Sequence, residues 1–152
     1  MQGVYLQVDA TLDPKGRLVL PARLRRKLIQ LDVDALVIKV HPDLKAVFGY
    51  TEQDWAEKIE GPLDNGHPFS MSQLDLEHAY LAGAQTVEVD AQGRILIPPK
   101  MREEAELDRD LVVNVMRGRL EIWSAERWAE RASYAANHTS TPEGVHLLER
   151  PR

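Results

Sequence analysis

The sequence predicts a mainly β protein with short helices, in which two copies of one unit share a hydrophobic core. The first observation is an internal repeat, in which five residues recur 77 positions later: Asp13, Gly16, Arg17, Pro21 and Arg25 correspond to Asp90, Gly93, Arg94, Pro98 and Arg102. The second is that both copies read as strand, turn, strand, helix, strand, turn, strand, helix. Because a unit of roughly fifty residues is at the edge of what folds alone, we expect the copies to form one core.

The first copy begins with a weakly alternating stretch at 3–8, which predicts a strand. Asp13-Pro14-Lys15-Gly16 predicts a turn, since proline suits the second position and glycine accepts a positive φ. A second strand is expected at 17–20. Pro21 ends it, because proline has no N–H to donate, and predicts a helix at 21–29. The inward face of this helix is expected to carry Leu24, Leu28 and Leu31.

Two further strands, 35–40 and 45–50, are expected around the turn residues His41-Pro42-Asp43. Thr51 predicts the N-cap of a helix that ends near 59. Glycine and proline at 60–70 predict a connection between the copies. A helix from Ser70 or Ser72 to about 82 follows, and Gly83 is expected to end it. Its apolar residues are Leu74, Leu76, Ala79, Tyr80 and Leu81.

The second copy is expected to have strands at 86–89 and 94–97 around the Asp90–Gly93 turn, and a helix from Pro98 or Pro99 to 107. Strands follow at 111–116 and 120–123, and Ser124 is expected to cap a helix. The chain is therefore divided into a first repeat (3–59), a connection with a helix (60–83), a second repeat (84–135) and a tail (136–152). The tail is poor in apolar residues and is expected to be mobile.

Positive charge is unevenly distributed. The net charge is −5, which by itself disfavours a nucleic-acid partner. Residues 1–50, however, carry a net +3, whereas 51–89 carry −7 and 90–152 carry −1. Such a layout can present one basic face on an acidic protein.

Several classes of function have no support in the sequence. Without cysteine there is no disulfide, thiol nucleophile or cysteine zinc site, which fits a reducing cytoplasm. No histidine pair has metal-ligand spacing, and no phosphate-binding loop or nucleophile elbow is present. No apolar run is long enough for a transmembrane helix, and the start lacks the features of a signal peptide. We therefore expect that the protein is not an enzyme, that it uses no cofactor, metal or small-molecule substrate, and that it has no membrane partner.

Asp13 and Asp90 could form a catalytic acid–base pair, but each precedes an arginine by four residues across a glycine turn. An Asp–Arg pair would hold both side chains in the charged form, so we favour a structural role in which each aspartate caps its turn. The aromatic residues could likewise stack on bases, but their helix and strand positions favour a place in the core. They are Phe48, Trp55, Tyr80, Trp123 and Trp128.

The segment from Asp13 to Leu28 holds six basic residues. Two interpretations stay open: a solvated charged surface, or contacts to a nucleic acid from a compact turn and a helix start. The second copy is less basic, since Gln92 replaces Lys15 and acids replace Arg26 and Lys27. A structural role is therefore more plausible for Arg94 than for Arg17.

The pattern Asp-x-x-Gly-Arg-Leu/Ile-x-Leu/Ile-Pro, present twice, resembles the MraZ family of bacterial regulators within the wider SpoVT/AbrB-like group of DNA-binding proteins. The resemblance covers about 3–130 and implies a double-split, swapped-hairpin β-barrel. It implies a cytoplasmic, nucleoid-associated transcriptional regulator that acts on its own operon in the division and cell-wall gene cluster. It also implies ring-like homo-oligomers that bind tandem repeats of double-stranded DNA.

The resemblance implies that DNA is contacted by the turn motif and by the start of the following helix, which here means Asp13, Arg17, Arg25, Arg26, Asp90, Arg94 and Arg102. Adjacent turn glycines and basic residues complete the candidate site: Lys15, Gly16, Arg23, Lys27, Gly93 and Lys100. The acidic stretch at 74–78 argues against a DNA contact from the connecting helix. The alternative is a protein-binding module, such as an antitoxin-like subunit that captures a partner along its acidic middle and tail.

Overall fold

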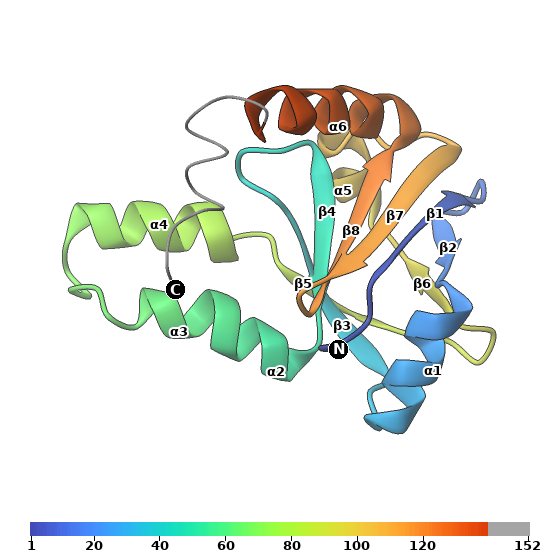
Figure 1. The fold of residues 1–152 in the computed structure, drawn as a ribbon. Helices are drawn as coiled ribbons and strands as arrows, with labels where there is room; N and C mark the ends of the chain where they lie inside the picture. Colours follow the sequence, from blue (N-terminus) through green and yellow to red (C-terminus); the bar gives the residue numbers. More distant parts are fainter. Residues whose placement is uncertain (140–152) are drawn as a thin grey trace.

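The computed structural model describes residues 1–139 (Figure 1). Eight strands form a six-stranded antiparallel sheet in the order β1-β7-β8-β4-β3-β5 and a two-stranded ribbon, β2-β6. The strands are β1 (Leu6–Thr11), β2 (Arg17–Val19), β3 (Ala35–Val40), β4 (Ala46–Tyr50), β5 (Gln85–Glu88), β6 (Arg94–Leu96), β7 (Asp110–Met116) and β8 (Arg119–Ser124). The expected mainly β fold is thus confirmed. The strands of residues 1–139 form no single closed ladder, so the double-split barrel stays a prediction.

The helices are short. They are α1 (Ala22–Gln30), α2 (Glu52–Trp55), the π-helix η1 (Ala56–Glu60), α3 (Gly61–Leu63), α4 (Met71–Leu81), α5 (Pro99–Glu104) and α6 (Ala125–Thr139). The expected caps are present, since the Oγ atoms of Ser70 and Ser124 and the Oγ1 atom of Thr51 each accept a backbone N–H at 3.0–3.1 Å.

Four details differ from the expectation. The first strand lies at Leu6–Thr11 and not at 3–8. The helix after Thr51 does not end near 59 but continues to Leu63, because Pro62 occupies the first turn of α3, where its missing N–H costs nothing. Leu31 does not face inward but is 45% exposed, since Asp32 turns the chain with a φ of 56°. Helix α6 continues to Thr139, and residues 140–152, most of the expected mobile tail, lie outside the described residues.

The strand register relates corresponding residues of the two copies. In the ribbon, Leu18 pairs with Ile95, its own counterpart 77 positions later. In the centre of the sheet, Val47 pairs with Ile122. The first strand of each copy pairs with the third strand of the other, as β1 with β7 and β5 with β3. The two copies therefore build one core in common.

That core lies on the inner face of the sheet, against the ribbon, α1 and α5. Its largest fully buried side chains are Leu18, Leu24, Leu28, Leu36, Ile38, Val47, Ile95, Ile97, Leu111, Val113, Leu120 and Ile122. Each such burial contributes about 1.5–3 kcal/mol. A second cluster, which includes Phe48, Trp55 and Trp123, covers the outer face, as expected for these aromatic residues.

Candidate nucleic-acid interface

The first turn is closed by the carboxylate of Asp13. Its Oδ1 atom accepts the backbone N–H groups of Lys15 (2.9 Å) and Arg17 (2.8 Å), and Oδ2 accepts Arg17 Nε–H (2.7 Å). The Gly16 N–H donates to the Asp13 carbonyl at 2.9 Å, and Gly16 has a φ of +86° that favours glycine. The aspartate thus shapes the turn and also fixes the first part of the arginine side chain, as the structural interpretation predicts.

The second turn repeats this geometry. Asp90 Oδ1 accepts the N–H groups of Gln92 and Arg94, both at 2.9 Å, and Oδ2 accepts Arg94 Nε–H at 2.8 Å. In both turns the pKa of the aspartate is lowered, chiefly by the hydrogen bond from the backbone N–H of the arginine four residues later. Both carboxylates are therefore charged at neutral pH, so neither can supply a proton as a general acid.

The two arginines differ at their outer ends. Their side chains are 34% (Arg17) and 27% (Arg94) exposed. Arg94 Nη2 donates to Gln92 Oε1 at 3.1 Å, whereas the Nη atoms of Arg17 have no partner among residues 1–139. Arg17 consequently presents its two Nη groups from a fixed position, free to donate to a ligand. This supports the expectation that Arg94 is the more structural of the two.

The ribbon sets the positions of the two turns. Because β2 and β6 are antiparallel, one turn lies at each end of the ribbon, and two further bonds of 2.9 Å join Leu20 N–H to Gly93 O and Ile97 N–H to Gly16 O. Figure 1 shows the ribbon and α1 together on the side of the molecule opposite α3 and α4.

Arg25 and Arg102 reach across to the turn of the opposite copy. Arg25 Nη2 donates to Ala91 O at 2.5 Å, and its side chain lies so close to Gly93 that a Cβ there would be 2.6 Å from Arg25 Cδ. Equivalently, a Cβ on Gly16 would be 2.7 Å from Arg102 Cζ. Each arginine thus packs on the other copy's glycine turn. The sequence does not predict this packing of Arg25 and Arg102 on the turns, and it suggests both residues only as DNA contacts.

The other candidate basic residues surround the ribbon. Lys15, Arg23, Arg26 and Lys100 are exposed, and Lys27 is half-buried. Arg23 Nη1 donates to Tyr5 O at 3.3 Å, and Lys100 lies 3.9 Å from a Glu104 carboxylate oxygen. The charge of Lys100 is therefore partly neutralised. Arg26, on α1, has no ion-pair partner among residues 1–139. The basic surface is stronger beside the first turn.

Within residues 1–139, no group of three or more metal-ligating side chains could hold an ion. None of the helices described there is both long enough and apolar enough to cross a bilayer. What the site offers is a pair of rigid turns with guanidinium groups, bordered by amines and further guanidinium groups on α1.

The sequence matches known proteins over most of its length. Residues 80–148 match the family model described as "MraZ protein, putative antitoxin-like". The chain is 38% identical over 138 residues to "Transcriptional regulator MraZ" of Solidesulfovibrio magneticus, which covers 90% of each protein. It is 39% identical to the proteins of the same name from a Marinomonas species (127 residues, 83% of each) and Heliobacterium modesticaldum (126 residues, 82% of this chain and 83% of the relative). The chain therefore belongs to the MraZ family.

Proposed function

We propose that this protein is a transcriptional regulator that binds specific sites in double-stranded DNA through the two-stranded ribbon and α1. The names of its relatives support regulation of transcription. The observation that carries the DNA contact is the first turn, where Asp13 holds Arg17 by Nε and leaves both Nη atoms free. A guanidinium fixed in this way is prepared for bidentate pairing with a guanine edge in the major groove.

The remaining residues have different roles in this proposal. Lys15, Arg23, Arg26 and Lys27 contact phosphates beside the first turn, and these contacts set orientation and affinity. Arg94 and Lys100 do the same, more weakly, beside the second turn. Arg25 and Arg102 hold the glycine turns in place. In this proposal 3–59 and 84–135 act as the two halves of one double-split barrel.

One barrel offers few base contacts, so tight binding requires several barrels on repeated sites. We propose a homo-oligomer, ring-like in form, that engages tandem DNA repeats in the cytoplasm at the nucleoid. Its targets would include its own operon in the division and cell-wall gene cluster. The description of the family as antitoxin-like makes capture of a protein partner the second candidate function.

The test is recovery of genomic fragments bound to the purified protein, followed by titration of the recovered site with two variants. Arg17→Ala should weaken binding by roughly tenfold or more, because one bidentate Arg–guanine pair is worth about 1–3 kcal/mol. Lys45→Ala is the matched control, since Lys45 is half-exposed, pairs with Glu106 at 3.0 Å and belongs to the connection between β3 and β4, not to either turn. Equal binding by both variants, with unchanged melting temperatures, would rule out the ribbon as the DNA-binding surface. A stable protein partner without DNA would favour the second function.

A further inference from the structure

The outward face of the β2-β6 ribbon combines two arginines with two apolar side chains. Leu18 and Ile95 are 0% and 1% exposed, so they form the face of the ribbon that packs on the core. Because successive residues of a strand point to opposite faces, the residues on either side of them point outward. These outward residues are Arg17 and Val19 on β2, and Arg94 and Leu96 on β6.

The two apolar side chains occupy equivalent positions in the two copies. Val19 and Leu96 are 77 positions apart, which is the offset of the internal repeat. In the ribbon, Leu96 pairs with Arg17 and Val19 pairs with Arg94. Residues directly opposite one another on antiparallel strands have Cβ atoms about 5 Å apart. Each copy therefore places an apolar side chain beside the arginine of the other copy.

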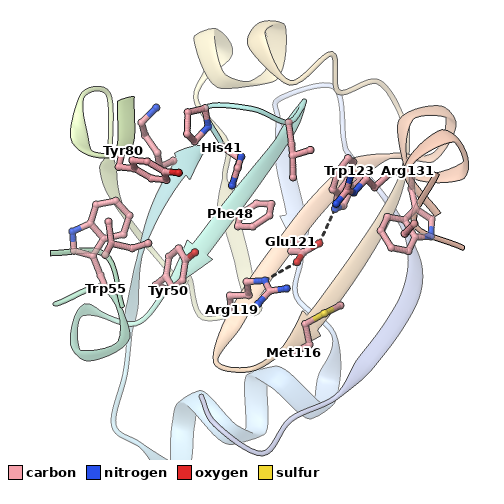
Figure 2. A pocket seen from close by; sticks show the side chains of 16 residues that line it. His41, Phe48, Tyr50, Trp55, Tyr80, Met116, Arg119, Glu121, Trp123 and Arg131 are labelled. Atoms are coloured by element: carbon pink, nitrogen blue, oxygen red, sulfur yellow. Dashed lines mark hydrogen bonds and ion pairs between the residues drawn. The ribbon is translucent and has the colours of Figure 1, made fainter. Parts of the chain in front are cut away.

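Packing within the chain does not account for this apolar pair. Val19 is 60% exposed and Leu96 is 51% exposed, and neither belongs to the two hydrophobic clusters of residues 1–139. The aromatic residues on the outer face of the sheet differ, since Phe48 and Trp123, which line the groove in Figure 2, are only 9% and 3% exposed. Large apolar side chains grouped on an open surface between charged groups mark an interaction site.

Strand propensity explains only half of the pair. A β-branched residue such as Val19 suits an exposed strand position even without a partner, but leucine does not share this preference. Since Leu96 lies at the equivalent position, the property that the two residues have in common is an apolar side chain. A function that needs this property at both positions is therefore a better explanation than strand formation.

DNA offers a matching group in the major groove. The groove is about 12 Å wide and admits a two-stranded β-ribbon. The base edges there present hydrogen-bond donors and acceptors and one apolar group, the C5-methyl of thymine. A ribbon that enters with Arg17 toward a guanine also brings Val19 and Leu96 to the bases, because all three side chains leave the same face. Neither apolar side chain can form a hydrogen bond, so a methyl group is the base edge that they fit.

We propose that Val19 and Leu96 contact thymine methyl groups and are specificity-determining residues of the DNA interface. Leu96 lies about 5 Å from Arg17 across the ribbon, and Val19 lies about 7 Å from it along β2. At 3.4 Å per base pair, these separations place both thymines about two base pairs from the guanine that Arg17 reads. This inference rests on the proposed function, because it requires the ribbon to lie in the major groove.

The test removes single methyl groups from the DNA. Deoxyuridine lacks the C5-methyl group of thymine and keeps all of its hydrogen-bonding groups. Each thymine of the recovered genomic site is replaced by deoxyuridine in turn, and the affinity of the full chain for one site is measured by fluorescence anisotropy. Two thymines near the guanine should each respond with about fourfold weaker binding, the effect expected for one buried methyl group.

Two variants assign the two thymines. Val19→Ala should bind the natural site more weakly and lose its response at one thymine, because the shortened side chain no longer reaches that methyl group. Leu96→Ala should lose the response at the other thymine. Val8→Ala is the matched control, since Val8 is 36% exposed and lies on β1 of the six-stranded sheet, outside the ribbon. It should respond at both thymines as the parent does, and melting temperatures check that all three variants are folded.

Fewer than two responding thymines in the parent, or ribbon variants that respond at the same positions as the parent, would overturn the proposal. Arg17→Ala distinguishes this failure from failure of the proposed function. If Arg17→Ala weakens binding while no thymine responds, the ribbon binds DNA and only the methyl contacts are wrong. If neither change has an effect, or if no DNA is recovered, both proposals fail.

Discussion

Replacement of Gly93 by alanine tests the support that each copy gives to the other's turn. Gly93 has a φ of +77°, and a residue with a Cβ in this left-handed region costs about 1–2 kcal/mol. Its Cβ would also lie 2.6 Å from Arg25 Cδ and 2.8 Å from Arg25 Nε. Arg25 would have to move and would lose its bond to Ala91 O, which adds about 1 kcal/mol for a partly solvated charged donor. We expect a total loss of about 2–3 kcal/mol.

Urea unfolding followed by tryptophan fluorescence measures this loss. The chain offers a close control, because Gly83 has a φ of +84° and nothing within 4 Å of its Cβ position. Gly83→Ala therefore reports only the backbone cost. The difference between the two glycine variants is the part that comes from Arg25.

A double-mutant cycle then separates the two terms. In an Arg25→Ala background, Gly93→Ala should cost no more than Gly83→Ala does, since no side chain is left to displace. The reasoning is refuted if Gly93→Ala and Gly83→Ala cost the same in the parent, or if the excess persists without Arg25.

Three further predictions concern the basic surface, the sheet and His41. Arg26→Ala should reduce the slope of log binding constant against log salt concentration by about 1 in anisotropy titrations, because one phosphate contact is lost. An unchanged slope would show that Arg26 does not contact a DNA phosphate. Asn114 is 0% exposed, and neither its Nδ2 nor its Oδ1 atom has a partner within residues 1–139. Asn114→Leu should raise the free energy of unfolding by about 1–3 kcal/mol, and a lower melting temperature would show that the amide is satisfied. Burial lowers the pKa of His41 from its ordinary 6.5, so the unfolded chain binds the proton first as pH falls, and stability should decrease below about pH 6.5. Urea midpoints from pH 7.5 to 5.5 should fall less for His41→Gln, and parallel curves would exclude this histidine.

The sequence predicts well what neighbouring residues decide. Thr51, Ser70 and Ser124 cap their helices because the side-chain oxygen accepts the unpaired backbone N–H three residues later. This hydrogen bond is local and does not depend on the rest of the fold. The turn at Asp13 is predicted for the same reason, since its carboxylate bonds stay within four residues. The strand at 45–50 is predicted from its own residues, and the core position expected for Phe48 is confirmed by the structure.

The rest depends on pairing over long distances. Arg25 has a role in the second turn only because β2 pairs with β6, which brings residues about 70 positions apart into contact. Local composition describes Arg25 as one more surface charge. The helix at 61–63 was also missed: Gly61 and Pro62 predict a connection between the copies, whereas the helix continues through them to Leu63.

The exchange of first strands between the copies also constrains how the chain is made. Leu6 in β1 pairs with Val115 in β7, 109 positions later in the chain. During synthesis β1 therefore stays unpaired until the second copy has also been made, and such distant pairings form slowly. For the same reason, a fragment that ends after the first copy lacks β7, so its β1 can pair only with a strand of another chain.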